Sequence, residues 1–208
     1  YNNAAASPTK FISGNVNDPA FSGSVKVNDQ VVFITIDEVM PLIEARVARD
    51  AKQCLESYAK VNAGSYPWAA PSSDMAYTST VNTRFGRLPA GIFSAANCNV
   101  NQAWWSNWQN FIFYTFPVSY QPSGATNCVA AGDCLTVDGA GQYSALVLMG
   151  RNAIGAQNHA NPTNPNNFLD STNATLATNY LFYKPSDVIN FAVVNDLVVC
   201  LDGQNNCK

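Results

Sequence analysis

The sequence predicts an α+β fold in which one long amphipathic helix packs on an antiparallel β-sheet meander. Three observations lead to this prediction. Residues 37–67 concentrate the charge of a charge-poor chain and place apolar side chains at three- and four-residue steps. Separate strings of β-branched and aromatic residues flank this stretch, with turn residues between them. Six cysteines, including two pairs that are close in sequence, offer disulfides that close loops.

The length fits one domain or one domain with an elaboration. The chain has 208 residues, of which 47% are hydrophobic, so it can bury a substantial core. Residues 1–36 are predicted to form an N-terminal β arm with a strand at 24–36. Residues 37–208 are predicted to form the globular domain.

The predicted helix has an apolar side that should pack on a sheet and a polar side that should face solvent. The apolar positions are Val39, Ile43, Val47, Ala51, Cys54, Leu55, Tyr58 and Val61. The polar positions, mostly on the other side, are Glu44, Arg46, Arg49, Lys52, Glu56 and Lys60.

Both ends of the helix carry recognisable signals. It starts either with a capping box at Thr35–Glu38 or only at Met40–Pro41, because proline is best tolerated in a first turn. Asn62 and Gly64 can take the positive φ that closes a helix. Pro67 then prevents continuation.

The rest of the domain is predicted to be a meander with loops. In 103–120 the second half has the aromatic density of a core strand that ends at Pro117. Residues 135–150 fit a hairpin around Asp138–Gly141, and 190–201 fit a final strand. Residues 64–97 are predicted to form an extended loop with short strands. The Asn- and Pro-rich stretch 151–187 is predicted to be a long surface loop with one short helix near 168–179.

The cysteines indicate an oxidising compartment. Cys128 and Cys134 bracket one short turn-rich loop, and Cys200 and Cys207 bracket another. With no CxxC motif and a single histidine, disulfides fit better than metal thiolates, and free core cysteines are the alternative. Cys54 and Cys98 would form the third pair by elimination, although six cysteines allow 15 connectivities.

The charge content excludes some classes of partner. Charged residues make up only 12% of the chain and the formal net charge is −3, so no basic face is available for phosphates or an anionic bilayer. Nucleic acid is therefore not an expected partner. No apolar run approaches the roughly 20 residues of a membrane span, and no signal peptide follows Tyr1.

Catalysis is not expected either. His159, the only histidine, lies in the Asn- and Pro-rich stretch, and no G-x-S-x-G motif accompanies it. We therefore expect a solvated loop residue there and no enzyme. One histidine cannot build a multi-histidine zinc site. The acidic turns at Asp133, Asp138 and Asp202 could ligate calcium, but neither stretch has the spacing of a known calcium loop, so no metal or other cofactor is predicted.

Trp104, Trp105 and Trp108 are the candidate surface-binding residues. Indoles give a large flat area with a hydrogen-bonding edge, which suits a sugar or another surface. On a strand, adjacent side chains point opposite ways, so at least one of the first two is expected to be exposed. Core packing beside FIFYTF is the alternative.

One pattern resembles a known family. The spacing Leu55-x-x-Tyr58-x-x-x-Asn62-x-Gly64-x-Tyr66-Pro67 resembles the end of the long first helix in type IV pilins and type II secretion pseudopilins. The further stretches that resemble larger pilin-like proteins are Gly86-Arg87-Leu88-Pro89, the aromatic run Trp104…Trp108…Tyr114, CLTVDG and VVNDLVV. The resemblance covers about 37–208. It implies a pilin-like domain with a C-terminal loop closed by Cys200 and Cys207.

The resemblance also implies a function. The chain would be a non-catalytic major or minor pilin or pseudopilin in filament assembly or surface attachment, exposed to the bacterial periplasm before assembly and extracellular afterwards. Its partners would be other pilin-like subunits in a homo- or hetero-oligomeric filament. Pilins have an apolar half-helix where this chain has its β arm. Either the membrane anchor lies upstream in a longer precursor, or this chain is a second pilin-like unit, or its assembly principle differs. The alternative is a monomeric secreted adhesin or carbohydrate-binding module that uses the Trp cluster.

Overall fold

A computed structural model describes residues 36–94, 98, 100–128, 134–151, 157–181 and 195–201. The chain divides into two compact units, Tyr1–Met40 and Pro41–Lys208. The described part of the first unit is the start of the first helix. The predicted strand at 24–36 lies outside the described residues except for Ile36, which is helical. The predicted division into 1–36 and 37–208 stays a prediction.

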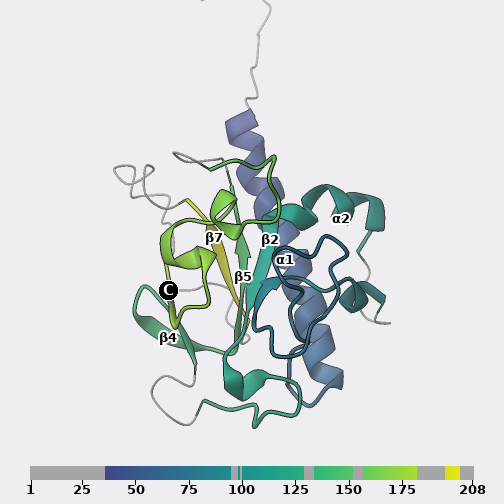
Figure 1. Ribbon diagram of the computed structural model, residues 1–208, viewed down its shortest axis with the longest axis vertical. Coiled ribbons are helices and arrows are strands. Elements are labelled where there is room, and N and C mark those ends of the chain that lie inside the picture. The colour runs from purple at the N-terminus through teal and green to yellow at the C-terminus, as the bar shows by residue number, and fades with distance from the viewer. Residues whose placement is uncertain are drawn as a thin grey trace, which may run out of the picture. The chain divides into compact units, whose positions relative to one another are not determined.

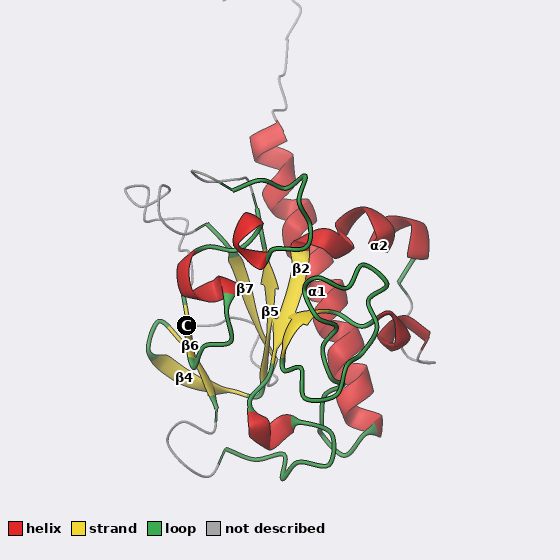
Figure 2. Ribbon diagram, viewed as in Figure 1, coloured by secondary structure: helices red, strands yellow, loops and turns green. Residues whose placement is uncertain are grey.

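The described residues form a mixed α+β structure, as the sequence predicts (Figures 1 and 2). The helices and strands are α1 (Ile36–Val61), β1 (Phe85–Arg87), α2 (Gln102–Trp108), β2 (Ile112–Thr115), β3 (Leu135–Val137), β4 (Ala140–Tyr143), β5 (Ala145–Met149), β6 (Asn179–Tyr180) and β7 (Leu197–Leu201). Short 3₁₀ turns connect several of them, including Ala90–Ser94, Pro165–Asn167 and Ser171–Ala174.

The main sheet has four antiparallel strands in the order β1-β2-β5-β7. Phe113 of β2 pairs with Leu148 of β5, and Val147 of β5 pairs with Val199 of β7. β2 and β5 are buried along their whole length, and apart from Thr115 their sequences are continuously apolar or aromatic rather than alternating. The predicted core strand before Pro117 is therefore confirmed.

Two apolar clusters cover the two faces of the main sheet. The cluster on the α1 face includes Val47, Ala51 and Leu55 of the helix and Ile112, Tyr114, Val147 and Met149 of the sheet. The cluster on the other face includes Phe113, Leu146, Leu148 and Val198 of the sheet, together with Leu135, Phe168 and Tyr180. Strand alternation sends neighbouring residues to opposite faces, so one strand serves both clusters.

A second, smaller sheet replaces part of the predicted single meander. Its order is β4-β3-β6; β3 and β4 form the predicted hairpin, and β3 pairs with β6 in parallel. Asp138 and Gly139 both have positive φ, +51° and +73°, as a tight two-residue hairpin turn requires. Residues 157–181 are not only a surface loop, because Phe168, Leu169 and Tyr180 bury their side chains against the main sheet.

α1 begins earlier than one of the two predicted starts and ends as expected. It begins at Ile36 and contains Pro41. At the other end, Gly64 N donates to Ala59 O at 2.8 Å. The positive φ values are at Ala63 (+54°) and Gly64 (+86°), so the prediction was right for Gly64 and wrong for Asn62.

The helix also buries two charged residues that were assigned to its solvent side. Glu44 is 4% exposed, and its Oε2 accepts from Arg151 Nε at 2.5 Å. Lys52 is 8% exposed and lies 3.5 Å from Glu56. Conversely, Val39 and Val61 from the predicted apolar face are exposed. The helix buries a wide arc only in its middle turns, where long polar side chains are enclosed by their neighbours.

Candidate functional site

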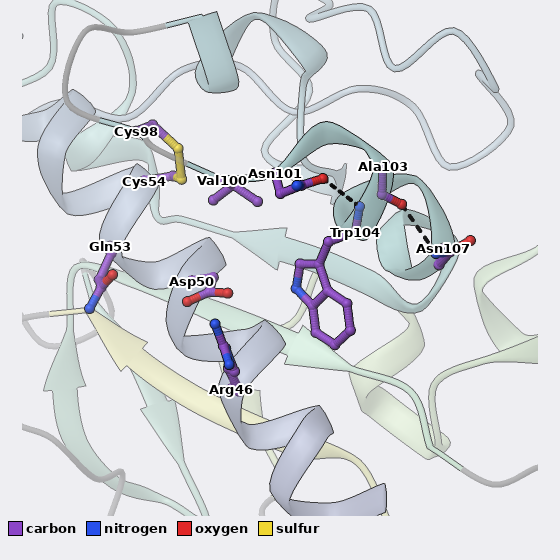
Figure 3. A pocket seen from close by; sticks show the side chains of 10 residues that line it. All are labelled: Arg46, Asp50, Gln53, Cys54, Cys98, Val100, Asn101, Ala103, Trp104 and Asn107. Carbon is purple, nitrogen blue, oxygen red and sulfur yellow. Dashed lines mark hydrogen bonds between the residues drawn. A yellow bond between two sulfur atoms is a disulfide. The ribbon is translucent and has the colours of Figure 1, made fainter.

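A groove between α1 and α2 is the candidate site. It has a volume of about 740 Å³, within the range of small-molecule sites. Its walls are formed by Arg46, Asp50, Gln53 and Cys54 of α1 and by Cys98, Val100, Asn101, Ala103, Trp104 and Asn107 (Figure 3). All of these residues belong to one compact unit.

The helix α2 sets the orientation of the tryptophans. Asn101 caps it, since its side chain accepts from Trp104 N at 3.1 Å. Trp105 is 4% exposed and packs on Phe93 with ring centroids 4.4 Å apart. Trp104 lines the groove, and Trp108, one turn later, supports it at a centroid distance of 5.6 Å. The residues were predicted to lie on a strand; they lie on a helix, and Trp105 alone of the three is fully buried.

A disulfide fixes one end of the groove. Cys54 of α1 is bonded to Cys98, with Cα atoms 4.9 Å apart, so the helix is tied to the segment that leads into α2 (Figure 3). Cys128 and Cys134 form a second disulfide, with Cα atoms 5.4 Å apart. Cys200 is disulfide-bonded as well, and its expected partner Cys207 lies outside the described residues. Such disulfides are typical of proteins that fold in an oxidising compartment.

Among the described residues, the groove is lined by one charge of each sign. Arg46 and Asp50 are one helical turn apart on α1 and both line the groove (Figure 3). In the described part of the chain neither takes part in an ion pair within 4.0 Å. Arg46 is exposed and Asp50 is half-buried, so both are within reach of a ligand.

A buried carboxylate pair lies away from the groove, and the sequence reasoning missed it. Asp170 accepts from Asn195 N at 2.7 Å and from Gln157 Nε2 at 2.8 Å. Asp196 accepts from Asp170 N at 2.8 Å and from Asn173 Nδ2 at 2.9 Å. Burial, together with the neighbouring Asp170, raises the pKa of Asp196 to about 7. Burial also raises the pKa of Asp170. Through these hydrogen bonds the pair connects residues 157–181 to Asn195 and Asp196, which directly precede β7.

Arg87 is a further buried charge, which the sequence analysis quoted only as part of Gly86-Arg87-Leu88-Pro89 and did not predict to be buried. It is fully buried, and its guanidinium donates to the carbonyl oxygens of Ser72, Asn110 and Pro162. Its Cζ lies 4.3 Å from the centre of the Phe113 ring. Burial lowers the pKa of Arg87 to about 10. The available signal was a lone arginine in the short apolar stretch FGRLP.

His159 is half-buried, rather than the fully solvated loop residue that the sequence suggested. Its ring stacks on Phe168 at a centroid distance of 4.9 Å and meets the edge of Phe111 at 5.3 Å. Its Nε2 is buried and has no hydrogen-bond partner among the described residues. Burial lowers the pKa of His159, which favours the neutral imidazole. The ring fills space between aromatic neighbours because 157–181 folds back over the main sheet.

The arrangement in the groove suits binding by stacking and hydrogen bonding. Within the described ranges, no three His, Cys, Asp or Glu side chains gather closely enough to hold a metal ion. No helix in the described part of the chain combines the length and the hydropathy that a bilayer-spanning helix needs.

No protein-family model, curated protein or solved structure matches this chain.

Proposed function

We propose that this chain is a non-catalytic, pilin-like structural subunit of an extracellular filament at the bacterial cell surface. The observation that carries the proposal is the long amphipathic helix α1, whose middle turns pack along one face of a four-stranded antiparallel sheet. Support also comes from the disulfide-bonded cysteines, including Cys200 on the last described strand. The other pilin-like subunits that it would contact are part of the same proposal.

The part of α1 that follows Pro41 offers an exposed apolar side chain for contact with a neighbouring subunit. Leu42 is 71% exposed, although it lies next to Ile43, which packs against the core. A leucine that is fully buried by a neighbouring subunit contributes about 1.5 to 3 kcal/mol to the free energy of association, relative to one that stays exposed. A filament repeats this gain at every subunit, so a single exposed leucine can decide assembly.

Replacing Leu42 by aspartate should therefore reduce filament assembly without unfolding the subunit. We expect the variant's share of the filament fraction to fall by about tenfold or more, because roughly 1.4 kcal/mol corresponds to a factor of ten. The measurement is immunoblotting of filaments sheared from the producing cell and collected by ultracentrifugation, with the full natural chain as the starting protein.

Val81→Asp is the matched control, because Val81 is also exposed (69%) and lies in a turn after α1. It should assemble like the natural protein, and both variants should keep the melting temperature of the natural subunit. The proposal is wrong if the natural protein is found only as free subunits in the medium. Equal assembly of L42D and V81D would remove Leu42 from the contact.

A further inference from the structure

The groove between α1 and α2 has the features of a ligand site that filament assembly does not require. Trp104 provides a half-exposed indole, and its neighbours hold it in place: Trp105 anchors α2 in the core, and Trp108 contacts the Trp104 ring. The Cys54–Cys98 disulfide fixes one end of the groove. A rigid site loses little conformational freedom on binding, so it gives more affinity for the same contacts.

Amide side chains line both walls of the groove. Gln53 on α1 and Asn107 on α2 are exposed. Asn107 Nδ2 donates to Ala103 O at 3.1 Å, which leaves its side-chain oxygen as an acceptor. Asn101 uses its side-chain oxygen to cap α2, which leaves its Nδ2 as a donor. The groove therefore offers donors and acceptors on either side of an indole face.

The charges indicate a ligand without net charge. Arg46 and Asp50 lie one turn apart on the same wall, so the positive and negative charges nearly cancel. An acidic ligand would meet Asp50, and a basic ligand would meet Arg46. A neutral ligand rich in hydroxyl groups can donate to the carboxylate and accept from the guanidinium.

From this combination we propose that the groove binds a short neutral oligosaccharide, with the apolar face of one sugar ring on Trp104. The volume of about 740 Å³ fits a ligand larger than a single sugar. A proline-rich peptide is the competing occupant, since such peptides also pack on tryptophan. Peptides of that kind dock in grooves lined by several aromatic rings, whereas the described residues of this groove include one indole among polar side chains.

The test uses the oxidised full chain and four neutral trisaccharides: chitotriose, cellotriose, maltotriose and mannotriose. Binding is measured by saturation-transfer-difference NMR and by titration of tryptophan fluorescence. We expect at least one trisaccharide to bind saturably, with a dissociation constant of about 1 mM or below. Trp104→Ala should weaken that binding by about tenfold or more, because stacking aromatic residues carry much of the energy of such sites.

Two further variants separate binding from folding. Gln53→Ala changes an exposed side chain on a stable helix, so it should fold normally and weaken binding by about threefold or more. Arg49→Ala, on the same helix but outside the groove, should bind like the natural chain. The proposal fails if none of the trisaccharides binds, if W104A binds equally well, or if only a proline-rich peptide binds. All measurements use isolated subunits, so a failure of filament assembly would not affect them.

Discussion

Replacing Arg87 by methionine should lower the free energy of unfolding by about 3 to 5 kcal/mol. Methionine fills much of the space but donates no hydrogen bond, so the carbonyl oxygens of Ser72, Asn110 and Pro162 lose the donor that they share. A buried acceptor without a partner costs about 1 to 3 kcal/mol. The contact of the guanidinium with the Phe113 ring is lost as well. The measurement is urea unfolding followed by circular dichroism with the disulfides intact.

Two related variants make this prediction specific. Arg87→Lys keeps the charge but offers a single nitrogen, so its stability should lie between those of the natural chain and the methionine variant. Arg84→Met changes a half-exposed arginine three residues earlier and should cost less than about 1 kcal/mol. If R87M is as stable as the natural chain, the hydrogen bonds of Arg87 do not contribute net stability.

The buried carboxylate of Asp196 should make the protein less stable as pH rises from about 4 to about 7. The pKa of Asp196 is raised from 3.8 in the unfolded chain to about 7 in the folded one. Between these values the folded state binds the extra proton, so raising the pH favours unfolding. The loss has a ceiling of about 4 kcal/mol, since one pKa unit corresponds to 1.36 kcal/mol. Asp170, whose pKa is raised as well, acts in the same direction.

Asp196→Asn should remove most of this pH dependence. The asparagine oxygen can still accept from Asp170 N and Asn173 Nδ2, and the amide does not ionise. The variant should therefore be clearly more stable than the natural chain at pH 8 and similar to it near pH 4, as measured by thermal unfolding across this range. Asp138→Asn, in an exposed turn, should leave the curve unchanged. Parallel curves for D196N and the natural chain would show that Asp196 is not the titrating group.

The sequence predicted the parts of the fold that depend on local pattern. The helical spacing of Val47, Ala51 and Leu55 located α1, and the aromatic density before Pro117 located β2. It could not predict the burial of Glu44, because its partner Arg151 is 107 residues away in the chain. The second sheet was missed for the same reason, since β3 pairs in parallel with the distant two-residue strand β6.

The candidate site was predicted only in part. The tryptophans were identified by residue type. Their predicted secondary structure was wrong, because β-propensity favoured a strand there. The cap at Asn101 was the overlooked signal for a helix, on which Trp104 lines the groove and Trp105 is buried in the core. The contribution of Arg46 and Asp50 could not be read from the sequence, since it depends on how α2 lies against α1.

The position of β7 sets an order of events during synthesis. β7 covers one edge of β5, and its residues are made long after those of β1, β2 and β5. Until Leu197–Leu201 emerges, the backbone N–H and C=O groups along that edge of β5 have no strand to pair with. An open edge of this kind can pair with a strand of another chain. Newly made chains should therefore be prone to edge-to-edge aggregation until β7 has paired with β5.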